Sequence, residues 1–381
     1  MKILIQTRST LQKLGGGDKV QLESTARALH DLGHDVTIAS RFVRVLEPYD
    51  VVHLFNMQIE PHSFMIYLLH AKAAGKPVAL STIYWNPDEW KRHDDTPVEV
   101  SGNQLSAKLK ALFSYKFKGV PLTTFWYYLA KSPELRRWLV MAFTKPSSGQ
   151  ATHYLKCCLV SGVGIILPNG NSEGDMVAHD FAKPRQSLFV PNGVTSEFKD
   201  VSPEPFIKQY GLKDFVLSVG RIESRKNVLG LAKATNELGL RLVLIGNDSV
   251  EPDYTEAVKQ AAGDKLLVIK EMPHEQLGSA YHAAKVHALV SWFETPGISS
   301  LEAAVAGCTI VTTEIGTTRE YFADLAYYCN PTNYPGIVAA LKKANAKPKT
   351  GRLSQHILAH FTWTDAALAS LEGYKRIGAK S

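Results

Sequence analysis

The sequence of 381 residues is poor in cysteine and has no long apolar run. Its four cysteines, Cys157, Cys158, Cys308 and Cys329, include no pair with metal-ligand spacing, and the adjacent first two make a poor disulfide pair. We therefore expect reduced thiols in a cytoplasmic protein. No stretch of 18 apolar residues is present, so no segment qualifies as a transmembrane helix. The opening residues lack the apolar length and small-residue cleavage site of a signal peptide, and they are predicted to form a strand.

Two common ligand motifs are also missing. The nicotinamide-binding pattern G-x-G-x-x-G is absent, and the second predicted strand ends at Ala39-Ser40-Arg41, where an acidic residue would be expected. No D-x-D carboxylate pair follows a predicted strand, since Asp94-Asp95 lies in a polar segment. The sequence therefore disfavours a nicotinamide cofactor and metal-dependent chemistry, and we expect no cofactor and no metal site.

What remains is an ordinary globular composition, with 45% hydrophobic and 21% charged residues. The length exceeds the usual span of one hydrophobic core and predicts two domains. Lys and Arg number 43 against 36 Asp and Glu, which gives a net charge of +7. This excess is compatible with anionic substrates, a membrane surface or nucleic acid, and it selects none of them.

Short apolar runs rich in β-branched residues alternate with helical patterns in both halves, which predicts parallel α/β architecture. The predicted strands are residues 2–7, 35–39, 51–54, 77–82, 163–167, 215–219, 241–245, 286–290 and 309–313. The predicted helices are residues 20–32, 228–238, 254–262, 299–306 and 364–377.

A segment marked by proline and glycine, residues 189–205, separates the two halves. The expected organisation is an N-terminal Rossmann-like domain over residues 1–195 and a C-terminal Rossmann-like domain over residues 196–363. The last helix, within residues 364–381, is expected to return to the N-terminal domain. Two doubly wound domains facing a central cleft are therefore the predicted architecture.

The most informative segment runs from Ser291 to Glu302 and reads S-W-F-E-T-P-G-I-S-S-L-E. It follows a predicted strand, contains a Pro-Gly turn and enters a helix, so the free N–H groups of residues 297–299 form an anion site. Glu294 lies on the loop and Glu302 about one turn inside the helix. Two carboxylates beside an anion site suit a ligand that also carries hydroxyl groups, as a nucleotide sugar does.

A second segment, Val219-Gly-Arg-Ile-Glu-Ser-Arg-Lys226, places Arg221 and Lys226 in a strand-to-helix turn, where ligands of open α/β sheets bind. Arginine offers a planar fork to phosphate oxygens, and lysine adds a compact charge. A third segment, Leu244-Ile-Gly-Asn-Asp248, is the end of another predicted strand followed by the turn glycine Gly246.

Together these motifs resemble the family 4 retaining glycosyltransferases of the GT-B fold, the glycosyl transferases group 1. The resemblance rests on Gly220-Arg221 with Lys226 five positions after the arginine, and on Glu294 with seven residues before Glu302. It also includes Gly246, the segment Pro191-Asn-Gly193 and the loop Gly15-Gly16-Gly17. The motifs follow the family's order over nearly the whole chain, and the two glutamates with the Arg/Lys pair are the most specific part.

The resemblance implies a role for each matching residue. Arg221 and Lys226 would bind the donor diphosphate, with Glu302 on the ribose. Glu294 and the amides of Gly297, Ile298 and Ser299 would hold the transferred sugar and distal phosphate. The backbone near Met272 and Leu277 would receive the base. Retention of anomeric configuration is also implied.

Two features of the N-terminal half leave alternatives open. The amides of Gly16 and Gly17 precede a helix and would approach a phosphate or sugar, or the loop is a plain connection. The family often has a histidine after the strand at residues 77–82, where this sequence has Tyr84 and Trp85. These aromatics either contact sugar on the acceptor side or pack in the core. Arg8 is either a cation near the glycine loop or a surface charge.

Residues 106–143 form a basic aromatic segment with seven lysines and arginines against one acid, Glu134. It is expected to lie on an anionic membrane, which would suit a lipid-linked acceptor, or to fill the core of an insertion. Nucleic-acid binding is disfavoured because no recognisable module accompanies the charge.

The sequence therefore predicts a metal-independent hexosyltransferase that uses a UDP- or GDP-sugar and a glycan or lipid-linked acceptor in bacterial surface polysaccharide synthesis. It would be cytoplasmic, with peripheral contact to the inner face of the membrane. The alternatives are a nucleotide-sugar epimerase and an inactive nucleotide-sugar-binding subunit.

Overall fold

The computed structural model describes residues 1–11, 16–84, 86, 119–144 and 149–380. Of these residues, the segments up to Tyr84, from 119 to Pro191 and from Thr364 onward form one compact unit, which we call unit 1. Asn192–Trp363 forms a second compact unit, unit 2. The chain thus leaves unit 1 close to the boundary expected after residue 195, and it returns to unit 1 at its last helix.

Unit 1 is built on a five-stranded parallel sheet with the strand order β2-β1-β3-β4-β5. Its strands are β1 (Lys2–Thr7), β2 (Asp35–Ala39), β3 (Val51–Phe55), β4 (Val78–Ser81) and β5 (Ile165–Ile166). β1, β3 and β4 are buried along almost their whole length, as expected for parallel strands with helices on both faces.

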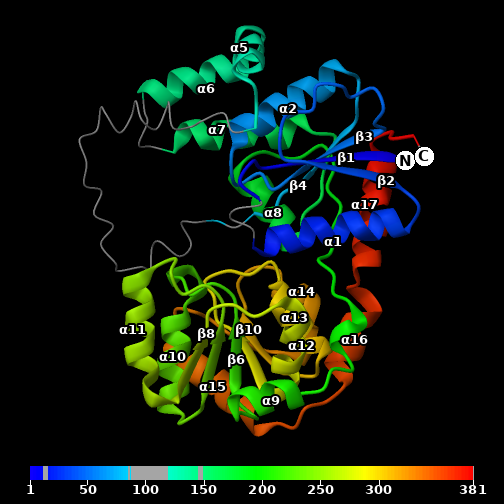
Figure 1. Cartoon of the computed structure of the whole chain (residues 1–381). Helices are drawn as coiled ribbons and strands as arrows, with labels where there is room; N and C mark the ends of the chain where they lie inside the picture. Colours follow the sequence, from blue (N-terminus) through cyan, green and yellow to red (C-terminus); the bar gives the residue numbers. More distant parts are fainter. Residues whose placement is uncertain (12–15, 85, 87–118, 145–148, 381) are drawn as a thin grey trace. The chain divides into compact units, whose positions relative to one another are not determined.

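The described helices of unit 1 lie around this sheet and are labelled in Figure 1. They are α1 (Gly17–Asp31), α2 (Pro61–Ala73), α5 (Leu122–Lys131), α6 (Pro133–Thr144), α7 (Gln150–Gly162), α8 (Asn171–Asp180) and α17 (Trp363–Arg376). α7 packs against α2 and α6, and α5 packs against α6 and α2. α5 and α6 therefore form an outer layer on the helices that cover one face of the sheet.

Unit 2 has a six-stranded parallel sheet with the order β11-β10-β9-β6-β7-β8. Its strands are β6 (Val216–Val219), β7 (Leu242–Ile245), β8 (Leu266–Ile269), β9 (Val286–Leu289), β10 (Thr309–Thr313) and β11 (Tyr327–Cys329). Its helices are α9 (Glu204–Tyr210), α10 (Val228–Glu237), α11 (Pro252–Ala262), α12 (His274–Ala283), α13 (Ile298–Val305), α14 (Thr318–Phe322), α15 (Tyr334–Ala346) and α16 (Arg352–His360). α10 lies between α11 and α15, while α13 packs on α12 and α16.

The predicted pair of parallel α/β domains is confirmed. The prediction omitted β8 and β11, the two edge strands of the unit 2 sheet. β8 is only partly buried and β11 has three residues, so neither carries the long apolar run of a central strand. The predicted strands 2–7, 35–39 and 309–313 match at both ends, and the ends of the other predicted strands differ by at most two residues.

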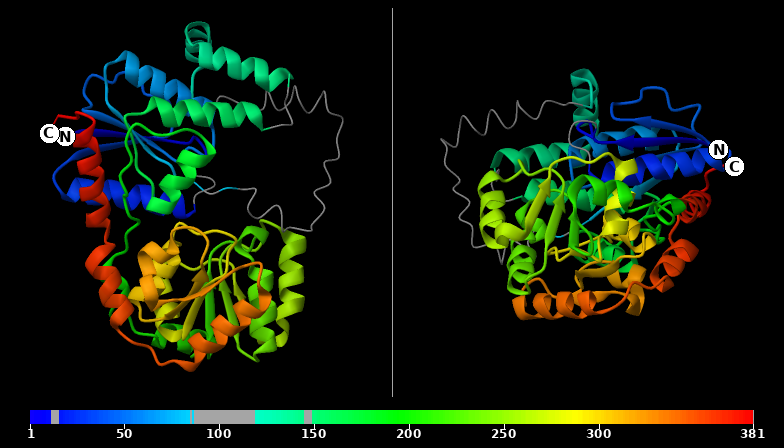
Figure 2. Two further views of the ribbon diagram at one scale, coloured as in Figure 1. Left: turned by 180° about the vertical axis from the view of Figure 1, so that it is seen from behind. Right: turned by 60° about the horizontal axis from the view of Figure 1, so that its bottom comes forward.

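α17 completes unit 1 from the far end of the chain (Figures 1 and 2). The hydroxyl of Tyr374 lies 2.7 Å from Nδ1 of His53 on β3, and Nε2 of His53 lies 2.9 Å from Oγ of Ser81 on β4. Burial lowers the pKa of His53 to about 3, so the ring is neutral and depends on these two partners. At Gly373 a Cβ atom would lie 2.8 Å from the end of the Leu167 side chain, so a larger residue there requires this side chain to move.

Tyr374→Phe is expected to lower the free energy of unfolding by about 1–3 kcal/mol, because it leaves one buried ring nitrogen of His53 without its partner. Urea titration followed by circular dichroism measures this loss. Tyr210→Phe is the matched control, since Tyr210 accepts only an exposed hydrogen bond from Gln209. Equal stabilities of the two variants would contradict the role assigned to the α17 contact.

Candidate active site

Most of the residues predicted to bind the donor lie in loops at the carboxyl edge of the unit 2 sheet. Gly220, Arg221 and Lys226 follow β6, and Glu294 and Gly297 follow β9. β6 and β9 are hydrogen-bonded neighbours, so the two loops start side by side. In open parallel sheets this edge is where ligands bind.

The centre of the site is an ion pair between Lys226 and Glu294. Lys226 Nζ lies 2.5 Å from Glu294 Oε1, and Ser291 Oγ donates to the same oxygen at 2.6 Å. The side chains are 17% and 6% exposed, so water screens this pair poorly. Burial opposes ionisation of Glu294, but the charges of Lys226 and Arg225 and the two hydrogen bonds together outweigh it and lower the pKa of this carboxyl.

The backbone of Glu294 is fixed by the loop that follows β10. Glu294 N donates to the carbonyl of Ile315 at 3.3 Å, and Thr317 N donates to the carbonyl of Glu294 at 3.0 Å. A Cβ atom at Gly316 would lie 2.1 Å from that carbonyl oxygen, so a larger residue does not fit. Asn192 Nδ2 donates to the carbonyl of Thr295 at 2.7 Å and holds the next part of the loop. The Glu294 carboxylate is therefore presented on a rigid support.

α13 begins directly beside this carboxylate. Gly297 has a φ of +90°, and its Cβ would lie 3.2 Å from Glu294 Oε2 and 2.9 Å from Leu289. Ser299 Oγ donates to the carbonyl of Val219 at 3.0 Å, which fixes the start of α13 to the end of β6. The first N–H groups of α13, from Ile298 onward, thus lie next to the loops that carry Arg221 and Glu294. Helix amides in this position favour a negatively charged ligand group.

Glu302 lies one turn further along α13 and is 5% exposed. Its Oε1 is 2.9 Å from Nε2 of His274, and its Oε2 accepts from the hydroxyl of Tyr281 at 2.8 Å. The hydrogen bond to Glu302 raises the pKa of His274. The His274 side chain is 58% exposed, whereas the Glu302 side chain is 7% exposed, so His274 is the partner that faces solvent. His274 and Tyr281 could not be predicted as site residues, because nothing in the sequence of α12 marks them as partners of a residue on α13.

Arg221 is less constrained than Lys226. Its side chain is 51% exposed, and Nε lies 3.4 Å from Glu223. Glu223 makes its closer contact with Arg225, at 2.9 Å from Nη2. The sequence reasoning missed Glu223 and Arg225, although both stand between Arg221 and Lys226 in the same turn. Arg221 therefore lies at the surface of the site.

Gly220 and Gly246 have a structural reason for being glycine. Both have positive φ, +151° and +147°, and a Cβ at Gly246 would lie 2.1 Å from the carbonyl oxygen of Gly220. The close approach of the two turns therefore requires glycine at position 246, and the positive φ favours glycine at position 220. Of the two residues predicted near the base, Met272 is half-buried in the loop after β8 and Leu277 is buried in α12.

The predicted residues Gly16 and Gly17 lie at the start of α1 in unit 1, and Gly15 lies outside the described residues. Asp18 accepts from the amide of Gly16 at 3.3 Å, so an acidic side chain already occupies part of this helix N-terminus. Arg8 is 3% exposed and lies 2.9 Å from the same carboxylate. The surface-charge interpretation of Arg8 is therefore wrong.

Tyr84 is 4% exposed. Its hydroxyl donates to Asp180 at 2.6 Å, its amide donates to Glu173 at 2.9 Å, and its ring packs on Phe181. These contacts favour the core-packing alternative for Tyr84. Trp85 lies outside the described residues.

All four cysteines are free, with Cys308 and Cys329 buried. Over the residues that the structure describes, no group of three or more His, Cys, Asp or Glu side chains is placed to hold a metal ion.

Comparison with known proteins identifies the segment that carries this site. Residues 204–355 match the model of the family described as glycosyl transferases group 1. The chain is 27% identical over 175 residues to the glycogen synthase of Mycobacterium tuberculosis, covering 42% of this chain and 42% of that protein. It is also 27% identical over 184 residues to the serotype-specific mannosyltransferase WbdA of Escherichia coli, covering 44% of this chain and 23% of that protein. The chain thus matches less than half the length of these relatives.

Solved structures share the fold over nearly the whole chain. Sucrose-phosphate synthase from Thermosynechococcus elongatus superposes with a TM-score of 0.67 at 17% identity and covers 100% of both chains. Anabaena HepE in complex with UDP has a TM-score of 0.67 at 14% identity, covering 98% of this chain and 100% of that chain. Together with the two parallel sheets, these likenesses identify the GT-B fold.

Lys226→Met is expected to lower the free energy of unfolding by about 3–5 kcal/mol, because it leaves the buried Glu294 carboxylate without its cation. Adding Glu294→Gln in the same chain should recover a large part of this loss, since the uncompensated charge is removed. Chemical denaturation of the single and double variants measures the coupling between the two residues. Additive losses would show that the ion pair does not exist in solution.

Proposed function

Since residues 204–355 carry the glycosyl transferases group 1 segment on a GT-B fold, we propose that this protein is a glycosyltransferase. It moves a hexose-type sugar from a UDP- or GDP-sugar to a glycan or lipid-linked acceptor. The observation that supports this most is the convergence of Lys226, Glu294 and the start of α13 at one edge of the unit 2 sheet. Cations, helix amides and carboxylates in one place suit a diphosphate joined to a sugar.

The diphosphate binds to Lys226, Arg221 and the amides that open α13. Negative charge grows on the departing nucleoside diphosphate as the bond to the sugar breaks, and fixed cations and amides stabilise that charge without reorganising. Helix amides and side-chain cations provide this stabilisation without a metal ion. Lys226 is already held in place by Glu294, so it loses little conformational freedom when the donor binds.

The two carboxylates bind hydroxyl groups. Glu294 Oε2, next to Gly297, accepts from the transferred sugar, and Glu302 accepts from the ribose beside its contact with the exposed His274. The bond between the anomeric carbon and the phosphate oxygen breaks, and the bond to the acceptor oxygen forms on the same face. The acceptor proton moves to the leaving phosphate oxygen, so the reaction proceeds with retention and needs no protein base.

Glu302→Ala is expected to weaken binding of the nucleotide-sugar donor by about tenfold to a hundredfold, because it removes a charge-assisted hydrogen-bond acceptor worth about 1.5–3 kcal/mol.

Arg221→Ala is expected to act mainly on kcat, lowering it by on the order of 10²-fold, since the charge it binds develops in the transition state. Calorimetry with UDP- and GDP-sugars and steady-state kinetics separate the two effects.

Glu275→Ala is the control for Glu302→Ala, because Glu275 is an exposed acid on α12. Unchanged donor affinity in Glu302→Ala would count against the site. Incubation of the donor without acceptor tests the epimerase alternative, which predicts an isomerised sugar in the product. Assays over a set of acceptors test the inactive-subunit alternative, which predicts tight nucleotide binding without turnover.

The outer helices of unit 1 support a lipid-linked acceptor and a role in bacterial surface polysaccharide synthesis. α5 and α6 bury one side, with Phe125, Tyr128, Leu129 and Leu135 in the core. Their exposed apolar side chains are Leu122, Trp126, Tyr127, Val140 and Phe143, each 51–60% exposed. Exposed Lys131, Arg136 and Arg137 accompany them. Apolar side chains beside cations suit peripheral contact with an anionic membrane on its inner face.

Part of the predicted basic segment, residues 106–118, lies outside the described residues. In the described part of the chain, no helix has the length and apolar character needed to span a membrane.

Trp126→Ser combined with Phe143→Ser is expected to reduce binding to phosphatidylglycerol vesicles by about tenfold or more, because burial of each large apolar side chain contributes about 1.5–3 kcal/mol. Co-sedimentation measures the bound fraction. Leu368→Ser is the control, since Leu368 is 51% exposed on α17, outside the α5–α6 surface. Equal loss in the control, or unchanged binding in the double variant, would remove the membrane contact from the proposal.

A further inference from the structure

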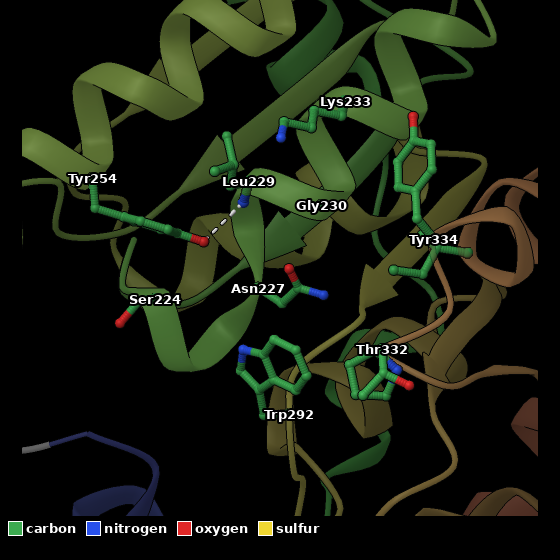
Figure 3. A pocket seen from close by; sticks show the side chains of 11 residues that line it. Ser224, Asn227, Leu229, Gly230, Lys233, Tyr254, Trp292, Thr332 and Tyr334 are labelled. Carbon is green, nitrogen blue, oxygen red and sulfur yellow. Dashed lines mark hydrogen bonds between the residues drawn. The ribbon is translucent and has the colours of Figure 1, made fainter. Parts of the chain in front are cut away.

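Unit 2 contains a pocket of about 570 Å³ that the proposed donor site does not use. It lies on the α10 side of the sheet, between the first turns of α10, α11 and α15, and Figure 3 shows it from close by. Its volume falls within the range of small-molecule sites. None of Arg221, Lys226, Glu294 and Glu302 lines it.

Three aromatic side chains from three different elements surround the pocket: Trp292 from the loop after β9, Tyr254 from α11 and Tyr334 from α15 (Figure 3). Each is anchored. The Tyr254 hydroxyl accepts from the amide of Leu229 at 2.9 Å, and the Tyr334 hydroxyl donates to Glu237 at 2.7 Å. The amide of Trp292 donates to the carbonyl of Arg225 at 3.2 Å. The hydroxyl contacts hold the two tyrosine rings in place, and the backbone contact fixes the loop that carries Trp292. Groups fixed before a ligand arrives lower the entropy cost of binding.

Polar groups lie between these rings. Ser224, Asn227, Lys233 and Thr332 line the pocket together with Gly230 of α10, and none of the described residues that line it is acidic. Leu229 and Ile337 supply apolar surface between them. Ring faces with hydroxyl, amide and ammonium groups around them match a pyranose, which has apolar C–H faces and a rim of hydroxyl groups.

We propose that this pocket binds pyranose units of a glycan chain and serves as a second carbohydrate subsite beside the donor site. The inference rests on the proposed function for the origin of the glycan. The connection between the sites is short: Ser224 lies two residues before Lys226, and Trp292 lies two residues before Glu294 in the sequence. A glycan anchored here is held next to the reaction centre, which raises its effective concentration there.

A nucleotide is the competing occupant, because bases also stack on aromatic rings. Among the described residues that line the pocket, Lys233 is the one cation, and no arginine offers a fork for a diphosphate. The groups suited to a diphosphate, including Lys226 and the amides of α13, lie in the donor site. Neutral sugar units therefore fit the pocket better than a nucleotide does.

The test uses the full chain with maltohexaose and α-linked mannohexaose as probes. Tyr334→Ala and Lys233→Ala are each expected to weaken binding of at least one probe by about tenfold, as truncation of a contact residue typically does. Their controls are Tyr210→Ala, a half-buried tyrosine on α9, and Lys342→Ala, an exposed lysine on α15. Calorimetry on proteins with matched melting temperatures measures the change. UDP and GDP binding should be unaffected in all four.

Two results would overturn the subsite: neither oligosaccharide binds, or both pocket variants bind them as tightly as their controls. Loss of UDP or GDP binding in the pocket variants would assign the pocket to the nucleotide instead. In transfer assays the pocket variants should raise KM for an oligosaccharide acceptor by about tenfold and leave kcat unchanged, with no effect on a monosaccharide acceptor. If the chain transfers no sugar at all, the proposed function fails, and the calorimetric comparison still decides the pocket.

Discussion

The arrangement of unit 2 around its site depends on one constraint, the burial of the Lys226 and Glu294 charges against each other. A carboxylate that is 6% exposed remains ionised only because a cation and a hydroxyl contact it directly. Each partner comes from a different loop, so the pair fixes the turn after β6 to the turn after β9. Gly297 and Gly316 lie against Glu294 because larger residues would displace it from that geometry. The positions of the site groups thus follow from keeping these two charges paired.

The same constraint gives the site its chemical character. Lys226 is already paired in the free protein, and the start of α13 is fixed to β6 through Ser299. Groups held in this way need little rearrangement to meet a diphosphate. Arg221 differs, because it is half exposed and only loosely paired with Glu223. The site combines fixed groups at its base with an adaptable cation at its surface, which suits a ligand that must enter and leave.

Much of this was predictable from the sequence. The fold could be predicted because the central strands carry continuous apolar runs. The main residues of the candidate site could be predicted because the motifs after β6 and β9 each contain glycines with cations or carboxylates in one short stretch. The partners of Glu302 could not, since His274 and Tyr281 meet it only through the packing of α12 on α13. The burial of Arg8 could not be predicted either, because its contact with Asp18 depends on the tertiary position of α1. The packing role of Tyr84 could not be predicted either, because the sequence does not show whether a tyrosine next to a strand is buried.

The return of α17 to unit 1 means that the order of residues along the chain does not divide the protein where its folding units divide. A fragment that ends before residue 364 keeps every strand of the first sheet, yet it lacks Tyr374 against His53 and Gly373 against Leu167. The apolar side chains that α17 covers would then be exposed to water. Recombination between homologous genes that exchanges the two halves at residue 191 would likewise pair one parent's sheet with the other parent's helix. The two ends of the chain must therefore evolve together, even though more than 300 residues separate His53 from Tyr374.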